Sequence, residues 1–106
     1  MNRFKQKLIV MSKNNSPNIR VTDEMIINSL DTFIHKPIIE MGERKIPNLT
    51  MAIGVINNVE YKHGLVIADV TMFTDKYKDR FRYDNWMITL NKNGFDYTEC
   101  MLNKEV

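Results

Sequence analysis

Residues 52–73, AIGVINNVEYKHGLVIADVTMF, decide the fold of this chain, because they have the pattern of two strands joined by a tight turn. Apolar side chains alternate along both halves, as in strands that bury one face. Lys62-His63-Gly64 supplies the turn. The alternation changes phase within the first half, so we expect a bulge near Gly54 or at Asn57-Asn58. The stretch therefore predicts an antiparallel hairpin.

A helix is expected earlier in the chain, over residues 22–35. Thr22 is a typical N-cap, because its hydroxyl can accept a hydrogen bond from an unpaired amide of the first turn. Asp23 and Glu24 follow it, where the helix dipole favours negative charge. Apolar residues then recur at helical spacing: Ile26, Ile27, Leu30, Phe33 and Ile34. Pro37 ends the helix, because it has no amide hydrogen and restricts the residue before it.

Four further strands are expected, over residues 6–12, 37–41, 86–90 and 95–101. The last two flank Asn93-Gly94, a strong hairpin signal, and their apolar residues alternate with polar ones. Hairpins with a helix inserted early indicate an α+β domain. We therefore predict a mostly antiparallel curled sheet or half-barrel of five or six strands with one or two helices.

Three segments are expected to connect these elements. Residues 14–18, NNSPN, and residues 42–48, GERKIPN, are rich in turn formers and predict loops. Residues 74–85, TDKYKDRFRYDN, are mostly charged and carry two aromatic residues four positions apart. This last segment fits either a short amphipathic helix capped by Thr74 or an irregular crossing between strands.

Length and composition indicate one domain, residues 1–106, with residues 1–7 as a basic N-terminal arm. The net charge is +2, but residues 1–22 carry +5, so the rest of the chain carries −3. The basic stretch is either a contact for acidic partners or a set of solvated charges around one strand, and the second is favoured. No apolar run approaches the ~20 residues of a membrane span, and no signal peptide is visible. We expect a soluble protein without a membrane partner.

The residue types that carry catalysis stand in unpromising positions. His35 falls at a helix end and His63 in a turn, while Cys100 falls in a strand, where a buried inert thiol is favoured. No serine occupies a sharp turn with a base beside it. The aspartates do not have metal-loop spacing, and the 4 glycines are too scattered for a phosphate loop. We predict no catalytic residue, no metal, no cofactor and no enzymatic activity.

Residues 76–83, KYKDRFRY, interleave four cations with three aromatic residues, a pattern that can bind nucleic acid. Asp75, Asp79 and Asp84 reduce the local charge to +1, so a nucleic-acid partner is not favoured. A solvated helix anchored by its aromatic residues and a protein interface both remain open. The residues predicted to contact a protein partner are Arg3, Lys5, Lys7, Tyr77, Arg80 and Trp86.

The order of features over residues 14–73 resembles the N-terminal half of tailed-phage prohead (capsid maturation) proteases. In that family an Asn-rich loop leads into a helix, a Lys-Pro-hydrophobic strand, and a hairpin of the form "IG-x-V … dGL-x-A-x-V". The matching residues here are Lys36-Pro37-Ile38, Ile53-Gly54-Val55-Ile56 and Gly64-Leu65-Val66-Ile67-Ala68-Asp69-Val70, the last with one extra residue before Ala68. The 12 Ile, 12 Asn and 10 Lys against 2 Ala also indicate an AT-rich genome, which many phages and many bacteria have.

The proteases of that family resemble serine enzymes, with a His shortly after the Lys-Pro strand and a Ser on a later strand. Glu40-Met41-Gly42-Glu43 stands where that His would be expected, and no serine follows Ser29. The resemblance therefore implies a relative without the catalytic residues, acting as a structural or assembly component of a virion.

Three functions follow as hypotheses. The first is a non-enzymatic phage-type protein that acts by protein–protein contact, as a capsid-associated or virion-assembly factor, through sheet-edge pairing or an apolar patch. The second is a small phage-encoded inhibitor of a host defence system or host enzyme, and the third is a minimal or degenerate serine protease. The expected partner is a capsid component or a host protein. The expected location is the cytoplasm of the host cell or the virion.

Overall fold

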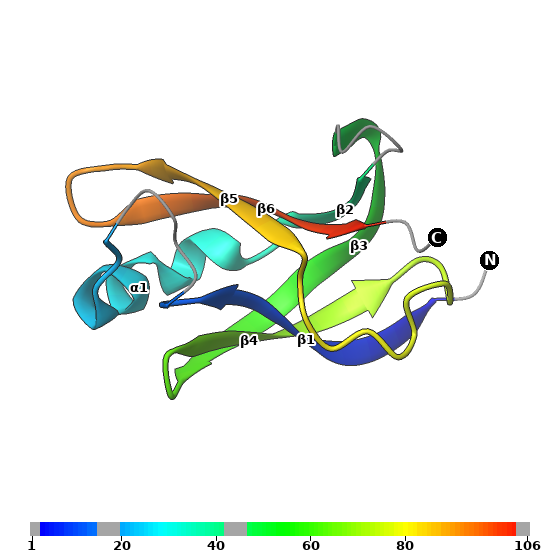
Figure 1. Ribbon diagram of the computed structural model, residues 1–106, viewed down its shortest axis with the longest axis horizontal. Helices are drawn as coiled ribbons and strands as arrows, with labels where there is room; N and C mark the ends of the chain where they lie inside the picture. Colours follow the sequence, from blue (N-terminus) through cyan, green and yellow to red (C-terminus); the bar gives the residue numbers. More distant parts are fainter. Residues whose placement is uncertain (1–2, 15–19, 42–46, 104–106) are drawn as a thin grey trace.

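The computed structural model describes residues 3–14, 20–41 and 47–103, and these form an α+β domain with one open six-stranded sheet (Figure 1). The strands are β1 (Phe4–Ser12), β2 (Pro37–Met41), β3 (Pro47–Lys62), β4 (Leu65–Met72), β5 (Asn85–Leu90) and β6 (Phe95–Asn103). Their order across the sheet is β1-β4-β3-β2-β6-β5. All neighbours are antiparallel except β2 and β6, which run parallel. The predicted α+β class and mostly antiparallel sheet are confirmed.

The central hairpin forms as expected from β3 and β4. His63 and Gly64 have positive φ values of 53° and 80°. Two-residue hairpin turns need such values, because only then does the turn match the twist of its two strands. Both expected places show a register shift: between Ile56 and Asn58 in the pairing with β4, and between Ala52 and Gly54 in the pairing with β2. β3 is longer than predicted, since it already includes Pro47 and Asn48, whereas the expected loops over 14–18 and 42–48 otherwise lie mainly outside the described residues.

The helical region is shorter than the expected residues 22–35. Thr22 is the N-cap as predicted, and its Oγ1 accepts a hydrogen bond from the Met25 amide at 3.2 Å. The α-helix α1 covers only Asp23–Ser29 and tightens into a 3₁₀ turn over Leu30–Phe33. Two hydroxyl groups make hydrogen bonds where the α-helix ends. The Thr32 hydroxyl donates to the Ser29 carbonyl, and the Ser29 hydroxyl accepts from the Phe95 amide of β6. The apolar stripe is correspondingly narrower, and Ile27 is 57% exposed.

The core lies on the concave side of the curled sheet, and α1 lies at the end where the β5–β6 hairpin turns (Figure 1). Phe33 stacks on Tyr97 with centroids 4.1 Å apart, and meets Phe95 edge-on at 6.0 Å. The Tyr97 hydroxyl donates to the carbonyl of Val10 at 2.8 Å. Since three strands separate β1 from β6 in the sheet order, this bond shows how strongly the open sheet curls.

Residues 74–84 form an irregular crossing, so the alternative of an amphipathic helix capped by Thr74 is wrong. The reason is that β1 takes the carbonyl groups a helix would use: Gln6 Nε2 donates to Arg80 O, and the Ile9 amide donates to Phe81 O. The Tyr83 amide in turn donates to Ile9 O at 3.0 Å. The crossing segment thereby covers part of the outer edge of β1.

The alternation predicted for the last strand holds only for its first half. Phe95 and Tyr97 face the core, but the register then shifts at the pairing with β5, and Cys100 and Leu102 face the core in turn. Met101 packs with Ile39 on the opposite face of the sheet. A bulge in the strand moves each later side chain to the other face, which alternation in the sequence does not reveal.

Candidate functional site

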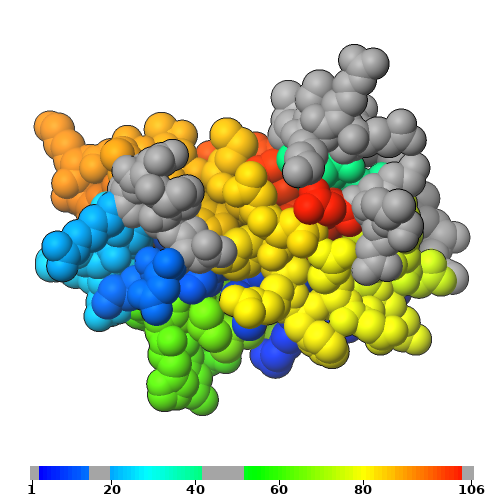
Figure 2. All heavy atoms as spheres, in the orientation of Figure 1, coloured from blue at the N-terminus to red at the C-terminus, as the bar shows by residue number. Residues whose placement is uncertain are grey.

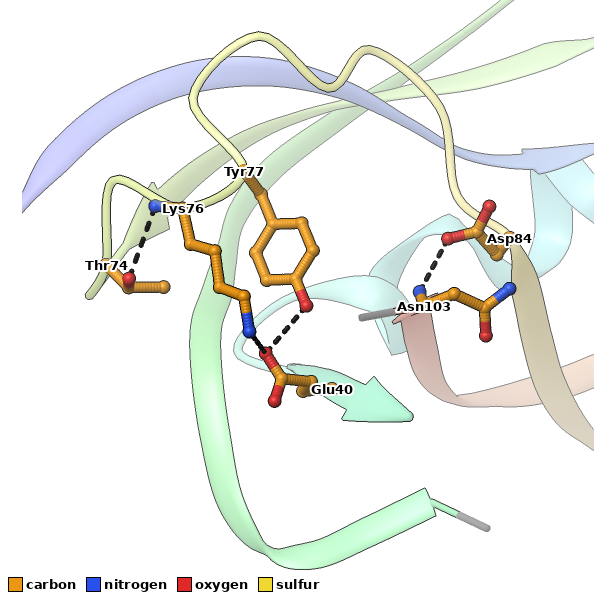
Figure 3. A network of polar contacts seen from close by, with 6 residues as sticks. All are labelled: Glu40, Thr74, Lys76, Tyr77, Asp84 and Asn103. Atoms are coloured by element: carbon orange, nitrogen blue, oxygen red, sulfur yellow. Dashed lines mark hydrogen bonds and ion pairs between the residues drawn. The ribbon is translucent and has the colours of Figure 1, made fainter. Parts of the chain in front are cut away.

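Tyr77, predicted as a contact residue, is only 2% exposed and belongs to the core. Its hydroxyl donates to Glu40 Oε2 at 2.6 Å, and Lys76 Nζ lies 3.1 Å from the same oxygen (Figure 3). Burial, together with this hydrogen bond to Glu40, raises the pKa of Tyr77 above its usual value. The side chain therefore anchors the crossing segment to β2.

Arg80 and Trp86 are also held by contacts within the fold. Arg80 Nη1 lies 2.5 Å from Asp84 Oδ2. The same oxygen accepts the Asn103 amide at 2.6 Å, as Figure 3 shows. Trp86 is half-buried against the core, and its amide donates to Asn85 Oδ1. The three predicted contact residues of this region are thus largely engaged within the fold.

Lys5 and Lys7 lie on β1, which is paired with β4 from Phe4 onward, and Arg3 lies immediately before it. Arg3 places its guanidinium 5.2 Å from the centroid of the Phe73 ring. Lys7 Nζ lies 2.9 Å from Asp69 Oδ1, and that contact raises the pKa of Lys7. Lys5 is exposed. An open hollow of about 630 Å³ lies beside them and is lined by Lys5, Gln6, Lys7, Asn57, Asn58, Asp69, Val70 and Thr71.

The residues considered for catalysis are dispersed. Cys100 is fully buried, and burial raises the pKa of its thiol to about 12. His35 and His63 are exposed in turns with positive φ. Over the ranges 3–14, 20–41 and 47–103, no hydrogen bond joins a serine to a histidine, and no group of three or more His, Cys, Asp or Glu residues could hold a metal ion. The absence of enzymatic activity stays a prediction.

None of the described helices has the length and apolar character needed to cross a bilayer.

The two outer strands of the sheet differ in what covers them. β1 has the crossing segment along part of its outer side, through the bridge between Ile9 and Arg82. Within the described part of the chain, no segment pairs with the outer side of β5. In Figure 1 β5 and the turn after it lie at the upper left margin, and Figure 2 shows the same orange hairpin on the surface.

The hydrogen bonds around β6 show which backbone groups of β5 point outward. The amides of Phe95 and Tyr97 point away from β5, because they donate to Ser29 Oγ at 3.0 Å and Thr32 Oγ1 at 2.9 Å. Their partners on β5 are Leu90 and Ile88. In an antiparallel ladder, residues of a pair that is not hydrogen-bonded both turn their backbone groups to the other side. The N–H and C=O groups of Ile88 and Leu90 therefore face solvent.

The side chains of β5, NWMITL, carry no charge. Met87 is 46% exposed and Leu90 is 54% exposed, so both faces of the strand offer apolar surface near its end. Natural edge strands are usually protected by charges, prolines or bulges that discourage pairing. The Asn85 side chain accepts a hydrogen bond from the Trp86 amide and so protects only the first residues of this edge.

Of the predicted contact residues, only Trp86 lies on this edge strand, and sequence reasoning missed the rest of it. The available signal was a six-residue strand without a charge, in a chain in which 26% of residues are charged.

Comparisons of the chain with protein families, with curated proteins and with solved structures found no match. The resemblance to prohead proteases therefore stays a prediction.

Proposed function

We propose that this chain is a non-catalytic protein-interaction domain, acting in virion assembly, that binds a protein partner by strand addition along the free edge of β5. The observation that supports the proposal most directly is the set of outward backbone groups of Ile88 and Leu90 on an uncharged strand. Strand addition draws affinity from such groups and specificity from the side chains around them.

The surroundings of β5 suit this role. β6 holds the strand on its inner side, and Ile88 and Trp86 pack against the core, so the edge is presented on a rigid support. Met87 and Leu90 add apolar area on the two faces. An incoming strand would gain backbone hydrogen bonds and cover both side chains, which the monomer leaves in water.

A photo-crosslinking amino acid placed at position 87 tests the proposal in cells in which the gene is expressed from its native genome. The matched control is the same crosslinker at Lys62, which is also exposed but lies at the β3–β4 hairpin. We expect position 87 to give a crosslinked product with a structural protein of purified virus particles, which can be a second copy of this chain, and position 62 to give none.

Two outcomes would count against the proposal. If the chain is absent from the particles and position 87 crosslinks to a host enzyme, the inhibitor hypothesis replaces the assembly role. Equal crosslinking from positions 87 and 62, or none from either, would remove β5 as the binding edge.

A further inference from the structure

We infer that the edge of β5 pairs with β5 of a second copy of this chain, antiparallel and across a two-fold axis that passes beside Thr89. The inference rests on the proposed function, because it uses the same edge and names its occupant. A two-fold contact requires a surface that is complementary to itself, and the backbone of β5 meets that requirement in one register.

In this register Ile88 lies opposite Leu90 of the second copy, and Leu90 lies opposite its Ile88. Each such pair exchanges two backbone hydrogen bonds, since all four groups involved point outward. The two pairs therefore satisfy every outward N–H and C=O group of Ile88 and Leu90 in both copies.

The neighbouring two-fold registers do not achieve this. An axis beside Ile88 would pair Leu90 with Trp86 of the second copy, but the Trp86 amide already donates to Asn85 Oδ1. An axis beside Leu90 would pair Ile88 with Lys92, which lies past the end of the strand in the turn before Gly94. Of these three axes, only the one beside Thr89 pairs strand residues whose outward amides are not already bonded to a side chain.

The side chains agree with the same register. Thr89 lies directly opposite Thr89 of the second copy, and facing threonines are a favourable cross-strand pair. Leu90, more than half exposed in the single chain, packs beside Ile88 across the interface. Because β5 is uncharged, self-pairing brings no like charges together within the strand. The antiparallel direction also brings the end preceded by Asp84 toward the end followed by Lys92.

Cysteine crosslinking tests the register. Residues opposite each other in a pair that is not hydrogen-bonded have Cα atoms about 4.5 Å apart, within the range that a disulfide spans. Thr89→Cys should therefore form an intermolecular disulfide under mild oxidation. Met87→Cys is the matched control: it is exposed on the same face, but its two copies lie four residues apart along the paired strands. We expect at least tenfold faster crosslinking at position 89, with the native Cys100 too buried to interfere.

Sedimentation equilibrium tests the hydrogen bonds. Leu90→Pro removes an outward N–H that the fold itself does not use, whereas Leu90→Thr keeps that N–H and changes only the side chain. We expect the wild type to dimerise in the micromolar to millimolar range, Leu90→Pro to weaken the dimer at least tenfold, and Leu90→Thr to weaken it less. Circular dichroism on each variant confirms that it is folded.

A wild type that stays monomeric to 1 mM, or equal crosslinking at positions 87 and 89, would overturn this inference. The proposed function fails separately. If the photo-crosslinker at Met87 still reaches a different protein while the wild type is monomeric, the binding edge stands and only its occupant is wrong.

Discussion

Gly94 lies where the β5–β6 hairpin meets α1, and its missing side chain allows the two elements to touch. The sequence motif Asn93-Gly94 suggests a glycine needed for positive φ, but among the described residues only His35, His63 and Gly64 have positive φ. A Cβ atom at Gly94 would instead lie 2.5 Å from Ser29 Oγ and 2.9 Å from the Met25 carbonyl oxygen. The turn itself is held by Asn91 Oδ1, which accepts the amides of Asn93 and Gly94.

Gly94→Ala should therefore destabilise the protein by about 1–3 kcal/mol, the usual cost of forcing extra atoms into a packed contact. Asn93→Ala is the control: its side chain is exposed and the amide that bonds Asn91 is retained. Its effect should stay within about 0.5 kcal/mol. Urea unfolding measures both, and equal stability of Gly94→Ala and wild type would contradict the close approach.

At the scale of elements, the helical region completes the sheet. β6 extends past the start of β2, so its first residues have β5 on one side and no strand on the other. Ser29 Oγ and Thr32 Oγ1 take that place by accepting the amides of Phe95 and Tyr97. This arrangement explains why α1 gives way to a 3₁₀ turn at Leu30, and it also fixes which β5 groups point outward.

Ser29→Ala should leave the buried Phe95 amide without its partner and cost about 1–3 kcal/mol. Asn28→Ala lies on the same helix with an exposed side chain and should change the unfolding free energy by less than about 0.5 kcal/mol. Denaturant unfolding provides the comparison. If Ser29→Ala lowered the unfolding free energy as little as Asn28→Ala, the Ser29 hydroxyl would not be needed at this edge.

At the scale of the whole molecule, four thiol and phenol groups link stability to alkaline pH. Burial raises the pKa of Cys100 to about 12, and burial with a hydrogen bond to Asp23 raises the pKa of Tyr61 to about 12. Burial also raises the pKa values of Tyr77 and Tyr97 above the usual value. A group whose pKa is higher in the folded than in the unfolded state stabilises the fold in its protonated form. That contribution is complete below the unfolded pKa and is lost as pH rises through the folded value.

The guanidinium chloride midpoint should therefore be constant between pH 6 and 8 and fall between about pH 9 and 12. Tyr77→Phe has no hydroxyl to ionise at that position, so its midpoint should fall less over the same range, although it begins lower for want of the bond to Glu40. A wild-type midpoint at pH 11 equal to that at pH 8 would show that these groups titrate normally in the folded protein.

Local signals predicted the local structure well. The turn at His63-Gly64, the N-cap at Thr22, the strand over Pro37–Met41 and the burial of Cys100 all follow from neighbouring residues and are confirmed. The end of α1, the irregular crossing over 74–84 and the face of Met101 do not, because each depends on a contact with a distant strand.

The sequence by itself determined the α+β class and the hairpins, because alternation, turn residues and caps act between residues close along the chain. Only the tertiary structure decided that β2 and β6 pair in parallel, that Tyr77 is buried, and that β5 is the last strand in the sheet. The deciding bonds join residues far apart, such as Phe95 with Ser29 and Tyr97 with Val10. Such pairings depend on how all the apolar faces can be buried together, which no short stretch of sequence specifies.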